Sequence, residues 1–206
     1  IDRIVDHFDN LVIRDLPEET EEAERYYEYL VELAERDREN LLANEVIAKD
    51  LDINDAFEEG TRYLFRHRLG VELMEPAGSE HPDGTVKFDD DTLFMWDNNS
   101  SSDVYTFPNS HVRQFKRYIR DSVEHRVNVF MIVVPDVADE AEHNCIRLKQ
   151  ESQHDADISI VRAEDLKWVA ENWQDYTGAD EFNLAVFDNT GILRRDKLEQ
   201  MMDVLL

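Results

Sequence analysis

The sequence predicts an α/β protein with a mixed central β-sheet flanked by helices and an extra helix at the N-terminus. Residues 127–134 (VNVFMIVV) form a nearly unbroken run of β-branched and apolar side chains, which is typical of a buried central strand. Two short apolar segments enclose the polar residues 89–91, which indicates a hairpin. Apolar residues at helical spacing occur before and after these strands, so helices and strands alternate as in layered α/β folds.

The N-terminal part is expected to be helical. After a short mixed segment at 1–16, residues 20–44 carry apolar side chains near one stripe and acids in the first turns, which predicts one long helix. Asn54 is a suitable N-cap for a second helix that reaches about residue 69 and is closed by Gly70. We expect residues 1–50 to form a helical segment or connector and residues 51–206 to form the main domain.

After Gly70 the pattern changes to shorter elements. The expected strands lie at 71–74, 85–88, 92–96, 127–134 and 158–161. The expected helices lie at 111–123, 138–151, 164–173 and 194–205. A turn-rich stretch at 76–84 and a polar stretch at 98–108 separate the first of these elements.

Acidic residues dominate the charge of this chain. Its 206 residues include 48 Asp and Glu against 22 Lys and Arg, only 6 of them Lys, and the formal net charge is −26. This composition resembles that of cytoplasmic proteins of salt-loving archaea, because molar salt shortens the Debye length to about 3 Å and screens self-repulsion. An acidic protein from an ordinary source is the alternative. The net charge argues against a nucleic-acid partner unless local patterns say otherwise.

Composition also excludes several classes of protein. A hydrophobic content of 42% and recurring periodic apolar segments argue against a disordered chain. No apolar run approaches the ~18 residues of a membrane span, and no signal peptide is visible. The single cysteine, Cys145, excludes an internal disulfide and a cysteine-based zinc site. A first residue other than Met suggests a fragment of a longer protein.

Two aspartates are expected to face each other across the hairpin. A three-residue loop at 89–91 would place Asp83 opposite Asp97, about 5 Å apart, with Asn99 on the same face as Asp97. Two carboxylates this close repel each other without a cation, and convergent oxygen ligands suit Mg²⁺ or another hard divalent ion. The alternative is structural: Asp83 starts a Pro-Asp-Gly turn and Asp97 ends a strand.

Glu58 and two residues of a later helix are further candidates. In the helix predicted to end near residue 69, Glu58 borders the apolar side, whereas Glu59 points almost opposite. Glu58 can therefore lean toward a site at the edge of the core, although a solvated surface acid is the alternative. In the helix at 111–123, Gln114 and Tyr118 are four residues apart and share one flank.

The helix at 111–123 also carries a basic stripe in an otherwise acidic chain. Its four members share one face of the helix: Arg113, Lys116, Arg117 and Arg120. Such a stripe is a candidate contact for the phosphate backbone of a nucleic acid. The alternative is a set of salt-bridge partners for nearby acids.

Several motifs follow one another in a fixed order between residues 55 and 135. They are Glu58, Pro82-Asp83-Gly84, Asp97-Asn98-Asn99, Tyr105-Thr106-Phe107-Pro108, and Gln114 with Tyr118. This order resembles the PD-(D/E)xK nuclease superfamily and is most similar to the cleavage domain of FokI-type restriction endonucleases. The resemblance implies a restriction-endonuclease-like core and the divalent-metal-dependent hydrolysis of DNA phosphodiester bonds, as the cleavage module of a restriction or defence enzyme.

The resemblance also implies roles for individual residues. Asp83 and Asp97 would hold Mg²⁺, or Mn²⁺, with the main-chain carbonyl of Asn98 as a further ligand. Glu58 would assist through a bound water or a second ion. Gln114 and Tyr118 would orient the site or contact the substrate backbone.

The implied partners are DNA, a second copy of the chain and a DNA-reading domain outside it. The basic stripe would steer and hold DNA. Two copies would pair transiently, because one site addresses one strand. The helical residues 20–44 would then serve as a connector to the DNA-reading domain.

One position departs from the family pattern. The family's lysine, two residues after the second acid, is Asn99 here. Asparagine can hydrogen-bond a water but carries no charge. Asn99 is therefore a natural variation with altered catalysis, a substitution that silences the enzyme, or a sign that catalysis is lost and binding retained. The alternatives to an endonuclease are a non-catalytic nucleic-acid-binding or dimerising module on the same fold, and an unrelated acidic α/β protein.

Overall fold

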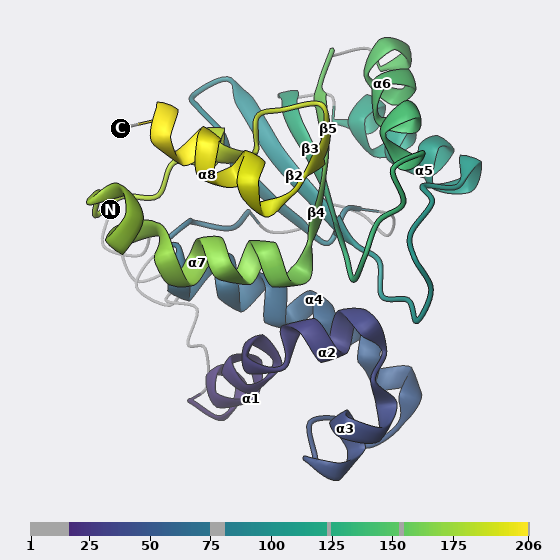
Figure 1. The fold of residues 1–206 in the computed structure, drawn as a ribbon, viewed down its shortest axis with the longest axis vertical. Coiled ribbons are helices and arrows are strands. Elements are labelled where there is room, and N and C mark those ends of the chain that lie inside the picture. Colours follow the sequence, from purple (N-terminus) through teal and green to yellow (C-terminus); the bar gives the residue numbers. More distant parts are fainter. Residues whose placement is uncertain (1–16, 75–80, 123–124, 153–154, 206) are drawn as a thin grey trace, which may run out of the picture.

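A computed structural model describes residues 17–74, 81–122, 125–152 and 155–205. The mixed segment predicted at 1–16 and most of the turn-rich stretch at 76–84 lie outside the described residues. A central sheet is covered by helices on both faces, and three short N-terminal helices extend the molecule beyond one edge of the sheet (Figure 1).

Five strands form the predicted mixed sheet, in the order β1-β2-β3-β4-β5. They are β1 Gly84–Lys87, β2 Thr92–Asn98, β3 Arg126–Val134, β4 Asp157–Arg162 and β5 Gly191–Leu193. β1 pairs antiparallel with β2, and the other neighbours are parallel. The β-branched run lies in β3, the middle strand. β5 was not predicted because three residues do not establish a period of two.

The described helices pack in two groups. Their bounds are α1 Pro17–Glu28, α2 Leu30–Glu35, α3 Arg38–Ala43, α4 Ile53–Tyr63, α5 Asn109–Asp121, α6 Ala141–Glu151, α7 Ala163–Thr177 and α8 Arg195–Val204. Shorter turns are the 3-10 helices Asp50–Asp52 and Leu184–Phe187 and the π-helical turn Leu64–Arg68. One core cluster joins α1–α4, α7 and α8 to one face of the sheet, and a second joins α5 and α6 to the other.

The single long helix predicted at 20–44 is wrong. The chain leaves helical geometry at Tyr29 and adopts a left-handed conformation at Arg36 (φ 56°), so three short helices replace it. The Asp37 side chain then accepts a hydrogen bond from the backbone N–H of Asn40 and starts α3. Apolar residues of these helices, Leu33 among them, belong to the same core cluster as the sheet. The domain division at residue 50 stays a prediction.

The second predicted helix starts earlier than expected. α4 begins at Ile53 rather than after an Asn54 cap, because the Asn54 side chain is engaged in contacts with other segments. The helix continues through the π-helical turn and ends at Gly70, whose φ of +67° confirms the predicted stop. The predicted strand at 71–74 is wrong: Leu73 forms only an isolated bridge to Val86.

Two glycines are required by close packing. A Cβ at Gly84 would lie 1.9 Å from the indole of Trp96, its partner across the β1–β2 ladder. A Cβ at Gly60 would lie 2.9 Å from the backbone of Tyr26, where α1 crosses α4. The glycine of the Pro-Asp-Gly motif therefore makes room for an aromatic ring.

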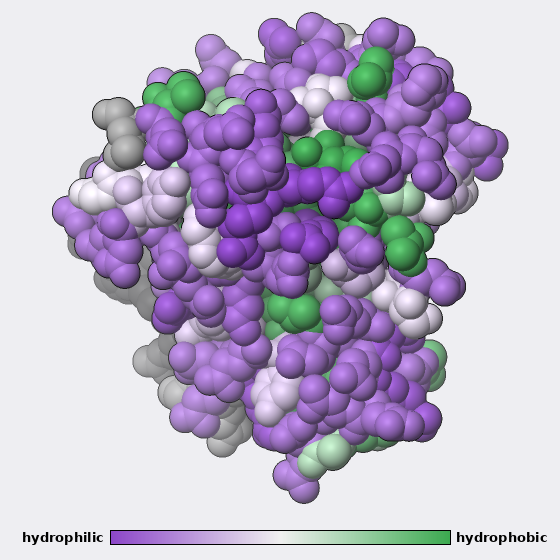
Figure 2. Space-filling view, viewed as in Figure 1, coloured by the Kyte–Doolittle hydropathy of each residue, from purple (hydrophilic) through white to green (hydrophobic). Residues whose placement is uncertain are grey.

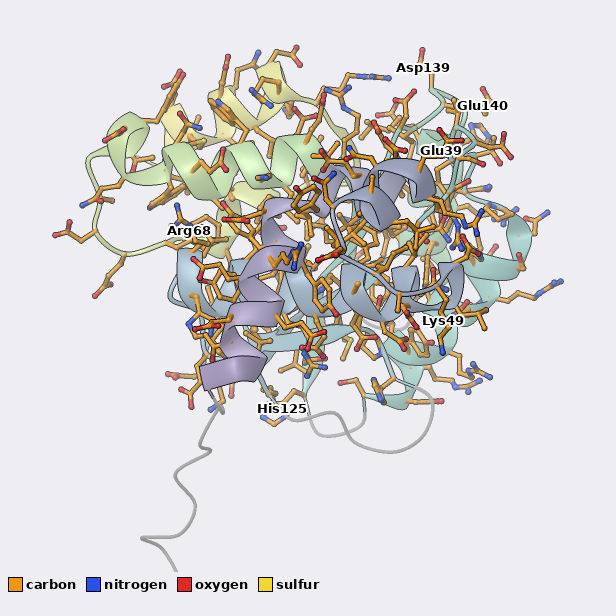
Figure 3. All side chains as sticks on the ribbon, turned by 90° about the horizontal axis from the view of Figure 1, so that it is seen from below. Glu39, Lys49, Arg68, His125, Asp139 and Glu140 are labelled. Atoms are coloured by element: carbon orange, nitrogen blue, oxygen red, sulfur yellow. The ribbon has the colours of Figure 1, made fainter. Side chains whose placement is uncertain are left out.

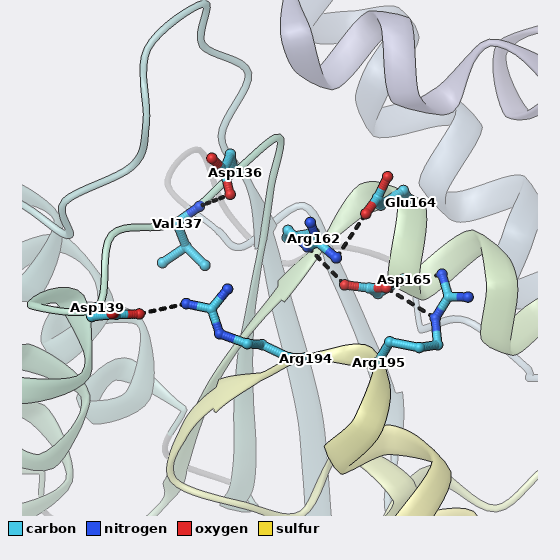
Figure 4. Close-up of polar contacts among 8 residues, drawn as sticks. All are labelled: Asp136, Val137, Asp139, Arg162, Glu164, Asp165, Arg194 and Arg195. Atoms are coloured by element: carbon cyan, nitrogen blue, oxygen red, sulfur yellow. Dashed lines mark hydrogen bonds and ion pairs between the residues drawn. The ribbon is translucent and has the colours of Figure 1, made fainter.

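A buried ion cluster joins the carboxyl ends of β4 and β5. Asp165, at the start of α7, is fully buried and accepts hydrogen bonds from Arg162 Nε (2.8 Å) and Arg195 Nε (3.0 Å) (Figure 4). Arg162 also pairs with Glu164 at 2.7 Å. Because the two guanidinium groups pair with the buried carboxylate, the cluster fixes α7 and α8 at this edge of the sheet.

The surface carries most of the charge. The face seen in Figure 2 is largely hydrophilic, with small separate hydrophobic patches. Exposed acids such as Asp139 and Glu140 lie at the periphery (Figure 3). The predicted adaptation to high salt stays a prediction. Among the described helices, none is both long and apolar enough to cross a membrane.

Replacing Gly84 with Ala tests the packing under the Pro-Asp-Gly motif. The added methyl group has to displace the Trp96 indole, so we expect a loss of about 2–3 kcal/mol in the free energy of unfolding, the cost of overpacking a core. Urea unfolding followed by tryptophan fluorescence measures it. Lys87→Ala, an exposed change on the same strand, should stay within about 0.5 kcal/mol. Equal stability of the two variants would contradict the packing described.

Candidate functional site

The hairpin has the predicted register. Lys87 pairs with Leu93 and Gly84 with Trp96, so the loop spans 89–91 as expected. The loop is closed by the Asp89 carboxylate, which accepts hydrogen bonds from two backbone N–H groups on its far side. The same register continued by one residue sets Asp83 against Asp97.

Asp83 and Asp97 are partly buried neighbours. Asp83 Oδ2 accepts a hydrogen bond from the backbone N–H of Asn98 (2.7 Å), and burial raises the pKa of Asp83 to about 6. The pKa of Asp97 is raised well above its ordinary value by burial first, and then by the negative charges of Asp83 and Glu58. The two carboxylates therefore repel each other in the folded protein, and a cation between them would be stabilising.

Glu58 joins this pair from α4. Burial, followed by the charge of Asp83, raises the pKa of Glu58 to about 7. Its Oε1 atom pairs with Arg62 Nη1 at 3.3 Å. As predicted, Glu59 is more exposed, with 53% of its side chain accessible against 29% for Glu58. Sequence reasoning missed Arg62, although its position four residues after Glu58 is the usual signal for a helical ion pair.

α5 carries the two predicted polar side chains, Gln114 and Tyr118, and brings Tyr118 near the aspartates. Gln114 Nε2 donates to the Tyr118 hydroxyl at 2.8 Å. Burial raises the pKa of Tyr118, and the charges of Asp97 and Asp83 add to the effect. Tyr105 is likewise buried and close enough to Asp97 for that carboxylate to raise its pKa further. Its hydroxyl lies 3.0 Å from Nδ1 of His111, which sequence reasoning did not single out.

The basic stripe on α5 is partly engaged within the protein. Lys116 pairs with Glu151 on α6 at 3.1 Å, and Arg120 pairs with the adjacent Asp121 at 2.8 Å. Arg117 lies over the Tyr118 ring, and Arg113 is exposed. For Lys116 and Arg120 the salt-bridge alternative holds, and contact of the stripe with phosphates stays a prediction.

A pocket of about 250 Å³ opens between the hairpin, α4 and the turn after α2. Its lining comes from all three segments: Arg36, Asn54, Phe57, Glu58, Asp83, Asn98, Asn99 and Ser100. Both polar atoms of the Asn98 amide are buried and have no hydrogen-bond partner among the described residues. The site thus unites Glu58, Asp83 and Asn99 in one pocket, whereas Asp97 is not part of its lining.

The donor atoms of this site suit a hard divalent cation. Within the part of the chain that is described, no three His, Cys, Asp or Glu side chains are arranged as a metal-binding group. Mg²⁺ in proteins is nevertheless often held by one or two carboxylates, with waters and a substrate phosphate as the other ligands. The partly buried pair Asp83 and Asp97, beside the unpartnered Asn98 amide, fits this pattern.

Comparison with known proteins gives the chain's family. A sequence model described as "FokI, cleavage domain" matches residues 7–192. The chain belongs to the FokI cleavage-domain family. Comparison with curated protein sequences finds no match.

Two solved structures of FokI resemble this FokI-family chain. The structure of the restriction endonuclease FokI has a TM-score of 0.62 at 15% identity, and the alignment covers 88% of this chain and 32% of that one. FokI bound to DNA has a TM-score of 0.56 at 16% identity, with coverage of 81% and 31%. The FokI-like fold is therefore confirmed, and the chain spans about a third of the length of FokI.

The raised carboxyl pKa values predict a pH dependence of stability. A carboxyl group with a raised pKa binds its proton more tightly in the folded state, so stability falls as pH rises from about 4 through the folded pKa values of about 6 and about 7. In metal-free buffer, the free energy of unfolding of Asp97→Asn should rise relative to that of the unaltered protein as pH increases across this window, because the variant lacks one of the repelling carboxyl groups.

Urea midpoints measured between pH 4 and pH 8 test this expectation. Asp90→Asn is the matched control, because Asp90 is an exposed loop acid of the same hairpin. A stability difference between the Asp97 variant and the unaltered chain that is constant with pH would contradict the proximity of the three carboxyl groups.

Proposed function

We propose that this chain is a divalent-metal-dependent DNA endonuclease domain, the cleavage module of a restriction or defence enzyme. The observation that carries the proposal is the juxtaposition of the partly buried carboxylates of Asp83 and Asp97, with Glu58 beside them, in a member of the FokI cleavage-domain family.

The metal would be Mg²⁺, or Mn²⁺, held by the carboxylates of Asp83 and Asp97 and the main-chain carbonyl of Asn98. When bound, such an ion polarises the scissile phosphate and lowers the pKa of an attacking water. In return, its positive charge offsets the repulsion that raises the carboxyl pKa values.

The side chains around the carboxylates supply orientation and proton transfer. Glu58, with a pKa near neutrality, can accept at Oε2 the proton that water loses as its oxygen attacks phosphorus, while Oε1 keeps its pair with Arg62. The leaving 3′ oxygen takes its proton from solvent. The Gln114–Tyr118 pair, held by its 2.8 Å hydrogen bond, orients the site or contacts the substrate backbone.

Asn99 favours a second candidate, a non-catalytic nucleic-acid-binding or dimerising module on the same fold. Its side chain lines the pocket where the family carries lysine, and an amide can orient a water or a phosphate oxygen without supplying charge. Loss of the charge slows hydrolysis, because preorganised charge is a large part of transition-state stabilisation.

DNA is the proposed substrate, and one relative of similar fold is described as FokI bound to DNA. Double-strand cleavage would need a transient pair of this chain, since one site addresses one strand. Because this chain spans about a third of the length of FokI, we propose that a separate domain reads the recognition sequence.

Cleavage of plasmid DNA in molar KCl with Mg²⁺ or Mn²⁺ tests the function. We expect slow nicking by the unaltered chain, about tenfold or more faster nicking by Asn99→Lys, and at least ~100-fold slower nicking by Asp83→Asn in the Asn99→Lys background. Lys87→Asn, which removes an exposed charge from the same hairpin, is the control. If neither the unaltered chain nor Asn99→Lys cuts DNA and both bind it, the endonuclease proposal fails and the binding module stands.

A further inference from the structure

Arg36 is held at the edge of the candidate site by the break between α2 and α3. Its left-handed backbone conformation (φ 56°) ends α2. The carbonyl of Ala34, two residues earlier, accepts a hydrogen bond from the backbone N–H of Ser101 (2.9 Å), which ties this turn to the loop that follows β2. The turn therefore faces the end of the strand that carries Asp97.

Three hydrogen bonds fix the Arg36 guanidinium. Nη1 donates to Asn54 Oδ1 (3.0 Å) and to Ser100 Oγ (3.1 Å), and Nη2 donates to Asp50 Oδ2 (3.1 Å). A guanidinium has five N–H groups, so two remain for a further acceptor beyond the described contacts. The Arg36 side chain keeps 28% of its surface accessible, which leaves it within reach of a ligand.

The charge of Arg36 is only partly neutralised. Asp50 is its ion-pair partner, and 49% of the Asp50 side chain is exposed, so the pair is a weak, solvent-screened one. Asn54 and Ser100 are neutral. A guanidinium held in this way can pair with a phosphate without losing its present contacts.

Side chains of opposite charge line the same pocket. Glu58 and Asp83 lie on it together with Arg36, the one cationic side chain among its described lining residues. Asn98, with its unpartnered amide, and Asn99 lie on the same pocket. Carboxylates alone would repel a backbone phosphate, whereas an arginine and an amide donor beside them are the groups that bind one.

We propose that Arg36 binds a phosphate of the nucleic-acid backbone in the pocket that it shares with Glu58 and Asp83, and so positions the strand to be cut. This inference rests on the proposed function. The turn after α2 is then part of the substrate site. Arg36, from this turn, supplies a positive charge that Asn99 lacks.

Binding of a fluorescent DNA duplex tests the proposal, with Ca²⁺ present as an oxygen-seeking ion and with KCl varied. Arg36→Gln should weaken binding about tenfold, and should reduce the slope of log affinity against log salt by about 1, as expected for the loss of one phosphate contact. Arg38→Gln is the matched control: it removes the same charge two residues away, from an exposed position on α3. It should change the affinity by less than about twofold, since it does not line the pocket.

Arg36 also has structural contacts, so a second measurement uses the unaltered protein. In an NMR titration with the same duplex, the Nε–Hε signal of Arg36, assigned with Arg36→Lys, should shift while that of Arg38 stays in place. An unshifted Arg36 signal, or equal affinities and salt slopes for the two glutamine variants, would overturn the role of Arg36. If Arg36→Gln and Arg38→Gln bind DNA alike while the unaltered chain binds and cuts it, only the role of Arg36 fails and the proposed function stands. If the unaltered chain neither binds nor cuts the duplex, the proposed function fails together with it.

Discussion

The antiparallel pairing of β1 with β2 fixes where the other groups of the site can lie. Its register is locked by the contact of Gly84 with the Trp96 indole, which occupies the space that any Cβ at residue 84 would need. The same indole stacks on Phe65 at 4.3 Å, so the helical segment that carries Glu58 is attached to the hairpin through this ring. One aromatic contact under the hairpin thus positions both the aspartate pair and the glutamate beside it.

The electrostatic consequence is a site that is unfavourable on its own. Three carboxyl groups are gathered at the edge of a core, in a chain of net charge −26, and burial raises the pKa of each. The nearby cations offset only part of this cost: Arg62 pairs with Glu58, and Arg36 lines the same pocket. A fold that keeps such a cluster is typical of a functional site, where local stability is lost in exchange for ligand binding.

The fold could be predicted where local patterns decide it. The apolar run of β3 and the loop at 89–91 give the middle strand and the hairpin register, and the register in turn gives the pairing of Asp83 with Asp97. The breaks in the N-terminal helices could not be predicted, because the apolar stripe continues through a left-handed Arg36. The place of Arg36 in the site depends on contacts with Asn54 and Ser100, which lie 18 and 64 residues away in the chain. A local sequence pattern does not reveal contacts between residues so far apart in the chain. For the same reason, Asn54 was wrongly predicted to be a helix cap.

The most direct test of this account is a count of divalent ions on the unaltered protein, by calorimetric titration of Mn²⁺ in molar KCl. The account predicts one saturable site that is lost in both Asp83→Asn and Asp97→Asn and is kept in Asp90→Asn, since Asp90 is an exposed loop acid. Binding that is undiminished in either of the first two variants, or no saturable binding in the unaltered chain, would contradict the claim that the hairpin brings its two aspartates together to hold a cation.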